Sequence, residues 1–96
     1  MGRFTGMRSV NEVGWALCRT PEGRLLSGPL AEGTPMSVNI PVGCPGGSRL
    51  AGLFHTHPAG VAFPSDTDIR SAKAVGAGSL CIDADGQLAC YRTADL

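Results

Sequence analysis

Side chains that could bind a metal ion gather between residues 55 and 68. His55 and His57 are the two histidines of the chain, and Asp68 follows eleven positions after His57. Side chains at positions i and i+2 of a strand project from the same face, so both imidazoles can reach one point. Two prolines and a glycine in the intervening segment can turn the chain back. Two neutral imidazoles and one carboxylate are a normal ligand set for a catalytic zinc ion, whose fourth position stays open for water.

Other interpretations of these residues exist. Two histidines and a carboxylate also form the facial triad of non-haem iron oxygenases. Those sites place the carboxylate next to the first histidine, whereas here it comes last, and a cupin would carry a glutamate shortly after the H-x-H pair. The plain alternative is a pair of polar histidines at a strand end without an ion. The order of the ligands favours one Zn²⁺ ion.

The spacing of Ser65 and Asp68 has a purely structural explanation as well. Ser65-Asp66-Thr67-Asp68 resembles a capping box, in which Ser65 caps a helix and Asp68 occupies its third position. An acidic residue in the first turn is also favoured by the helix dipole. The two interpretations are compatible, because a helix that begins here would hold Asp68 toward the histidines.

These residues resemble the motif of a known family. His55-Thr56-His57-Pro58, followed by Asp68 with Ser65 three positions before it, closely resembles the JAMM (MPN+) motif of zinc metalloproteases. The Pro58-Ala59-Gly60 and Pro64-Ser65 details are similar to the RadC branch of that superfamily. The resemblance implies a single α/β (α+β) domain with a cytidine-deaminase-like fold over residues 1–96, in which a mixed sheet packs against the helix after the motif. It would be a minimal prokaryotic, archaeal or viral form.

The resemblance also implies roles for individual residues. His55, His57 and Asp68 would hold the zinc ion, and Ser65 would donate a hydrogen bond to the oxyanion of the tetrahedral intermediate. Family members place the general base just before a short apolar strand, which selects Glu12 and leaves Glu32 as the reserve candidate. The general base takes a proton from the attacking water and passes it to the leaving amine.

The implied activity is that of a zinc metallopeptidase. Its substrate would be an isopeptide or peptide bond at the C-terminus of ubiquitin or a ubiquitin-like protein. One alternative is a RadC-like or toxin-associated protein with another substrate or no peptide substrate. The other is a non-catalytic interaction module in which a zinc ion only stabilises the fold of a small domain.

Composition excludes other classes of function. The chain is 43% hydrophobic and 17% charged, which is typical of a globular domain. Its net charge is zero and its basic residues are scattered, so we expect no nucleic-acid partner. No apolar run approaches the ~20 residues of a membrane span. We expect a cytoplasmic protein whose residues 1–10 form a loose arm, and a homodimer or partner subunit that supplies additional surface.

The pattern of apolar residues predicts the elements that position the motif. We expect the side chains of Trp15 and Phe54 to anchor the core. Proline in the third strand predicts that it lies at a sheet edge. Asp85-Gly86 predicts a two-residue type I′ turn in a final hairpin. The predicted strands cover residues 13–18, 24–30, 36–42 and 49–57, a helix covers residues 66–75, and the hairpin covers residues 79–92.

The four cysteines show no C-x-x-C spacing, which disfavours a zinc ribbon. The predicted hairpin places Cys81 opposite Cys90, in a pair of positions at the short limit for a disulfide. Two free thiols in a reducing cytosol are the preferred interpretation. Cys44, in a loop rich in glycine and proline, could approach a histidine as a nucleophile, but the histidines are better used as metal ligands.

Overall fold

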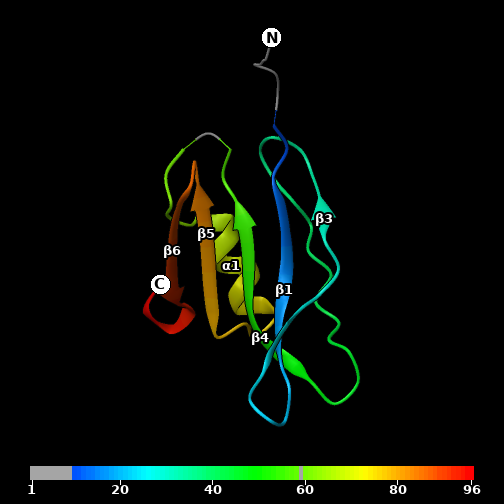
Figure 1. Cartoon of the computed structure of the whole chain (residues 1–96). Helices are drawn as coiled ribbons and strands as arrows, with labels where there is room; N and C mark the ends of the chain where they lie inside the picture. Colours follow the sequence, from blue (N-terminus) through cyan, green and yellow to red (C-terminus); the bar gives the residue numbers. More distant parts are fainter. Residues whose placement is uncertain (1–9, 59) are drawn as a thin grey trace.

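The computed structural model describes residues 10–58 and 60–96, so the predicted arm lies outside the described residues except for Val10. One mixed, six-stranded sheet has the order β2-β1-β4-β5-β6, with β3 also paired to β1 (Figure 1). The elements are β1 Val13–Arg19, β2 Leu25–Ser27, β3 Ala31–Glu32, β4 Arg49–Thr56, α1 Asp66–Ala74, β5 Ser79–Ala84, β6 Gln87–Arg92 and the 3-10 turn η1 Thr93–Asp95.

The central pair of strands explains why the helix lies where it does. Strands β4 and β5 are parallel, whereas β1 runs antiparallel to β4 and β6 runs antiparallel to β5. Parallel neighbours cannot be joined by a tight turn, so the chain crosses over between them. Helix α1 forms that crossover and covers one face of the sheet (Figure 1). The mixed sheet with one helix confirms the predicted fold class.

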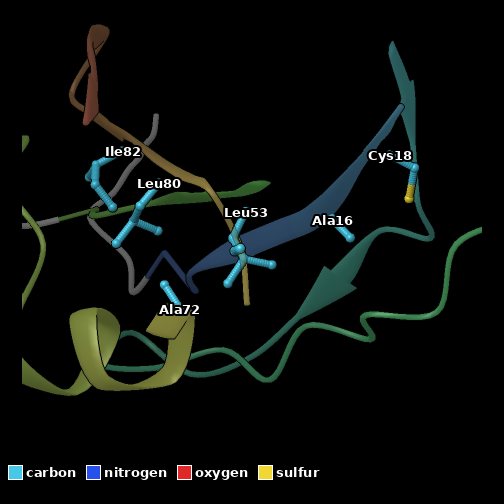
Figure 2. Packing of buried hydrophobic residues seen from close by; sticks show 7 residues of the cluster. Ala16, Cys18, Leu53, Ala72, Leu80 and Ile82 are labelled. Carbon is cyan, nitrogen blue, oxygen red and sulfur yellow. The ribbon is translucent and has the colours of Figure 1, made fainter. Parts of the chain in front are cut away.

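The core lies between the sheet and α1. Figure 2 shows small and branched apolar side chains from β1, β4 and β5 directed toward the helix, where Ala72 meets them. The buried members of the cluster are Ala16, Cys18, Leu53, Ala72, Ala77, Leu80 and Ile82. Alternation along β1 buries every second residue on this face, as expected for a strand with one covered side.

The predicted core anchors lie on the other face, and that prediction is wrong. Trp15 and Phe54 are cross-strand partners whose rings stack with centroids 4.5 Å apart, and both are only half-buried. The face toward the helix instead carries Gly14, Ala16 and Cys18 from β1. Small residues fit this part of the face because the segment after β3 packs closely against β1, with Ile40 over Gly14 and Cys44 bonded to Cys18.

The predicted third strand over residues 36–42 is also wrong. The structure pairs Ala31–Glu32 with β1 instead, and the segment after β3 runs without regular structure on the helix side (Figure 2). The hydroxyl of Thr34 accepts hydrogen bonds from the main-chain N–H groups of Met36 and Ser37, which turns the chain away from the sheet. The predicted strand over residues 24–30 shortens to β2.

The final hairpin and the helix agree with the sequence prediction. Asp85 and Gly86 have φ angles of 53° and 83°, as a type I′ turn requires, and Cys81 pairs with Cys90. The helix begins at Asp66 and ends at Ala74. Among the described residues, none forms a helix that is both long and apolar enough to cross a membrane.

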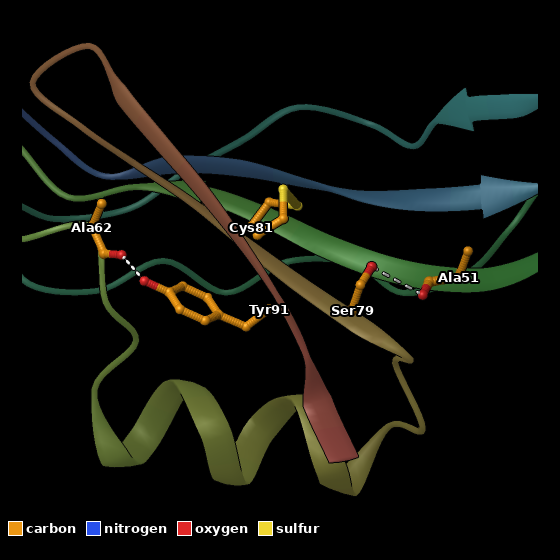
Figure 3. The surroundings of a disulfide bond; sticks show 6 residues. Ala51, Ala62, Ser79, Cys81 and Tyr91 are labelled. Carbon is orange, nitrogen blue, oxygen red and sulfur yellow. Dashed lines mark hydrogen bonds between the residues drawn. A yellow bond between two sulfur atoms is a disulfide. The ribbon is translucent and has the colours of Figure 1, made fainter. Parts of the chain in front are cut away.

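All four cysteines form disulfides, so the preference for free thiols is wrong. Cys81 and Cys90 join β5 to β6, with Cα atoms 4.0 Å apart, on the face turned away from α1 (Figure 3). Cys18 joins β1 to Cys44 in the segment after β3, with Cα atoms 5.8 Å apart. Cys44 therefore has no free thiol, which excludes it as a nucleophile. Disulfides are typical of oxidising compartments and of hyperthermophiles.

Candidate metal centre

The two histidines lie together at the end of β4. His55 occupies the strand's penultimate position and His57 follows its last residue. Their Nε2 atoms are 3.0 Å apart, because side chains two residues apart share one face. The main-chain N–H of His57 donates to the carbonyl of Asp83 at 2.9 Å, which extends the β4–β5 pairing past the formal strand end. The backbone of both residues is thereby fixed.

The ring of His57 has a defined tautomer. Its Nδ1 atom lies 2.9 Å from the carbonyl oxygen of Val61. A carbonyl oxygen only accepts, so Nδ1 carries the proton and donates it to this bond. In the neutral imidazole this leaves a lone pair on Nε2, the atom that faces His55. Metal-binding histidines are oriented by such a hydrogen bond from the second ring nitrogen.

Asp68 reaches the histidines from the first turn of α1. Its main-chain N–H donates to the Ser65 hydroxyl at 3.1 Å, and its Oδ2 accepts from the main-chain N–H of Ser65 at 2.9 Å. This reciprocal pair is the predicted capping box. The same Oδ2 atom lies 3.2 Å from each histidine Nε2. The cap therefore holds the carboxylate against both imidazoles.

The surroundings of Asp68 stabilise its ionised form. Burial alone would raise the pKa of this carboxyl, but the hydrogen bonds from His55 and from the main-chain N–H of Ser65 outweigh it. The pKa of Asp68 is therefore held well below its ordinary value. An ionised carboxylate at this position is available as a ligand for a cation.

The three facing atoms have the spacing that a metal ion requires. Their separations of 3.0, 3.2 and 3.2 Å define a triangle with a circumscribed radius of about 1.8 Å. Zn–N and Zn–O bonds of about 2.0–2.1 Å in a tetrahedral site imply ligand separations of about 3.3 Å. One point just above this triangle can thus lie at bonding distance from all three atoms. The donor set of two nitrogens and one oxygen fits a zinc site with one open position.

Glu12 lies beside the same pair of histidines. Gly14 pairs with His55 across β1 and β4, and continuing that register places Glu12 opposite His57 on the helix side. Ligand atoms of Glu12, His55 and His57 all lie within 4.8 Å of one another, so these residues also form a group that could hold a metal ion. The Glu12 side chain is only 6% exposed, and this burial raises the pKa of its carboxyl.

The main chain of Glu12 is held by the segment after β3. Its N–H donates to the carbonyl of Thr34 at 2.8 Å, and its carbonyl accepts from the N–H of Gly33 at 2.9 Å. Cross-strand neighbours share a face, so Glu32, which pairs with Val13, points away from the face that carries Glu12. Glu32 is exposed and accepts a hydrogen bond from Asn11. Only the first of the two candidate bases reaches the histidines.

The sequence reasoning missed the importance of Gly14. A Cβ atom at this position would lie 2.9 Å from Cβ of His55 and 2.8 Å from Cδ1 of Ile40. The missing side chain lets the segment after β3 pack directly over the strand pair that carries the histidines. A glycine inside an apolar strand is a signal of close backbone approach, and it could have identified this residue.

Comparisons with known proteins identify the family of this chain. The chain belongs to the prokaryotic homologs of the JAB domain, whose family model matches residues 39–93. The crystal structure of a JAB1/MPN domain protein from Archaeoglobus fulgidus matches with a TM-score of 0.56 and 19% sequence identity, covering 86% of this chain and 71% of that one. At this identity the likeness shows the shared fold alone. No curated protein matches the chain. The resemblance to the JAMM/MPN superfamily is thus confirmed.

Proposed function

We propose that this domain is a zinc-dependent metallopeptidase that hydrolyses an isopeptide or peptide bond at the C-terminus of a ubiquitin-like protein. The observation that carries the proposal is the convergence of three ligand atoms, from His55, His57 and Asp68, beside the buried carboxyl of Glu12. Members of the JAB/MPN superfamily include metallopeptidases and non-catalytic domains, so the proposal depends on these side chains and not on the fold.

Each residue would have a defined task. When bound, the zinc ion supplies a Lewis acid that acidifies water and polarises a carbonyl group. His55, His57 and Asp68 would hold the ion, with Asp68 fixed by the helix cap. Glu12 would accept a proton from the attacking water and deliver it to the leaving amine, and its place beside both histidines puts it within reach of that water. The Ser65 hydroxyl, which already accepts from the Asp68 N–H, keeps its own proton to donate to an oxyanion.

The experiment measures zinc content and cleavage together. Purified protein is incubated with fusions of a ubiquitin-like protein to a reporter, with and without a chelator, and zinc is quantified in the same samples. We expect one zinc ion per chain and cleavage that the chelator abolishes. Glu12→Gln should keep the zinc and lose about 10²–10⁴ in rate, the range for general acid–base catalysis.

Other outcomes distinguish the alternatives. Bound zinc without turnover, combined with unfolding on chelation, would support a zinc-stapled interaction module. Bound zinc and cleavage of other peptides, but not of ubiquitin-like fusions, would support a RadC-like or toxin-associated substrate. A buried glutamate next to the ligands favours the hydrolase, since a structural zinc site needs no base. The homodimer or partner subunit stays a prediction.

A further inference from the structure

A groove of about 400 Å³ leads away from the candidate metal centre. The segment over residues 36–42 forms one wall, the exposed side of α1 forms the other, and core side chains of β4 and β5 form the floor. His55, Ser65 and Asp68 lie at one end. The remaining lining residues are Met36, Ser37, Val38, Asn39, Ile40, Val42, Leu53, Thr67, Ser71, Val75 and Leu80.

The groove is uncharged outside its metal-binding end. None of its other lining residues carries a charge, and three large apolar side chains remain in contact with solvent there. Met36 is 85% exposed, and Val42 and Val75 are 38% and 39% exposed. Exposed apolar side chains gathered along one hollow mark a binding surface rather than ordinary surface variation.

One wall of the groove also offers unpaired main chain. Within the described part of the chain, no main-chain hydrogen bond joins Val38, Asn39, Ile40 or Val42 to another main-chain group. An extended peptide that lies alongside could pair with these N–H and C=O groups, in the manner of strand addition. Pro41 contributes no N–H, so the pairing has a gap at that position.

We propose that this groove selects substrate tails without charged side chains, over about four residues on one side of the scissile bond. This inference rests on the proposed peptidase function and narrows its substrate class. An arginine, lysine or carboxylate placed in the groove would lose water without gaining an ionic partner, which disfavours binding. Apolar residues would cover Met36, Val42 and Val75, and glycines next to the scissile bond would let the main chain approach the metal centre.

Three fusion substrates test the selection. They share one ubiquitin-like body and a terminal Gly-Gly, and the four preceding residues are apolar, basic or acidic. We expect the zinc-loaded protein to cleave the apolar tail with a kcat/KM at least about 10-fold above the values for the other two tails. The charged side chains of those tails would find no partner in the groove, and unpaired polar groups in a specific site cause discrimination of this kind. Equal cleavage of the apolar and basic tails would overturn the inference.

A single substitution should redirect the preference. Ser71→Glu places a carboxylate on the α1 wall, one turn beyond Asp68, and should raise cleavage of the basic tail relative to the apolar one by about 10-fold. Gln87→Glu adds the same charge at an exposed position of β6 outside the groove and should leave the ratio unchanged. Thermal unfolding checks that both variants are folded. An unchanged ratio in Ser71→Glu would count against the groove.

Binding measurements separate failure of this inference from failure of the proposed function. Fluorescently labelled tail peptides are titrated into zinc-loaded Glu12→Gln, which should bind without turnover. If no fusion is cleaved but the apolar tail binds about 10-fold more tightly than the charged tails, the peptidase proposal is wrong and the inference about the groove is supported. If the three peptides bind equally, or none binds, the inference about the groove is wrong whatever the activity.

Discussion

The candidate site is assembled from two regions that are held in different ways. The ligand region, residues 54–68, depends on the ends of regular elements, because β4 carries His55 and ends just before His57, and the cap of α1 fixes Asp68. The base region, residues 33–48, contains no helix or strand, yet it holds the main chain of Glu12 and forms a groove wall. Its anchors are the hydrogen bonds at Gly33 and Thr34 and the Cys18–Cys44 disulfide.

This difference implies that metal binding and turnover can be separated. Damage to the ligand region should release zinc, because the three ligand atoms depend on the strand end and the helix cap. Damage to the base region should leave zinc bound while it displaces Glu12 and opens the groove. Substitutions in each region, with matched controls, can therefore show which region supports which property.

Asp68→Asn should have the largest effect on the ligand region. The amide keeps the size of the side chain and an oxygen for the helix cap, but it removes the negative charge that faces both histidines. We expect zinc affinity to fall by at least about 100-fold, beyond the range seen when only an outer partner of a ligand is lost. Competition with a fluorescent zinc chelator measures the zinc affinity of the variant. Unchanged affinity in a folded Asp68→Asn protein would contradict the assignment.

Removal of the Cys18–Cys44 disulfide tests the base region. Paired substitution of both cysteines by serine should lower the free energy of unfolding by about 3 kcal/mol, as expected for the loop it closes. Turnover should fall by about 10-fold or more, with zinc content unchanged. The control is the matching substitution of Cys81 and Cys90, which join two strands on the face away from α1 (Figure 3). Equal loss of turnover in both variants would argue against a special role for the first disulfide.

Gly14→Ala should disturb the contact between the two regions. The added methyl group would meet the main-chain oxygen of Phe54 as well as the side chains of His55 and Ile40, so β4 and the segment after β3 must both shift. We expect a loss of about 1–3 kcal/mol in stability, the usual cost of overpacking, and slower turnover. Chemical denaturation and kcat/KM measure the two effects. Gly46→Ala is the control, since a Cβ there meets nothing within 4 Å.

Ser65→Ala should have the smallest effect on stability. It removes the hydroxyl that caps α1, which costs about 1 kcal/mol. The main-chain N–H that holds Asp68 remains, so zinc should stay bound. Turnover should fall by about 10²–10³-fold if the hydroxyl donates to the oxyanion, and Ser65→Thr should recover most of it. Full activity in Ser65→Ala would reduce Ser65 to a helix cap.

The sequence predicts the ligand region well because local rules govern it. The strand period puts His55 and His57 on one face, and the capping box fixes where the helix begins. These local rules do not predict the conformation of the base region. Residues 36–42 alternate like a strand, but the turn at Thr34 and the packing of Ile40 over Gly14 place them across the core. The position of Glu12 depends on that packing.

Long-range contacts also explain the other differences. Which face of β1 is covered depends on segments far along the chain, so the apolar pattern wrongly predicts that Trp15 and Phe54 anchor the core. The Cys18–Cys44 bond joins residues 26 positions apart and has no local signal. The expected cytoplasmic location stays a prediction, and the two disulfides instead resemble those of oxidising compartments or hyperthermophiles.

The assignment of His55, His57 and Asp68 as zinc ligands can be tested on the local structure around zinc in the loaded protein. X-ray absorption at the zinc edge, or anomalous diffraction from crystals, reports the ligands and their distances. We expect one zinc ion per chain, with two imidazole nitrogens and one carboxylate oxygen at about 2.0–2.1 Å and a further light atom in the open position. Sulfur ligands, or a zinc ion bound without His55, His57 and Asp68, would contradict it.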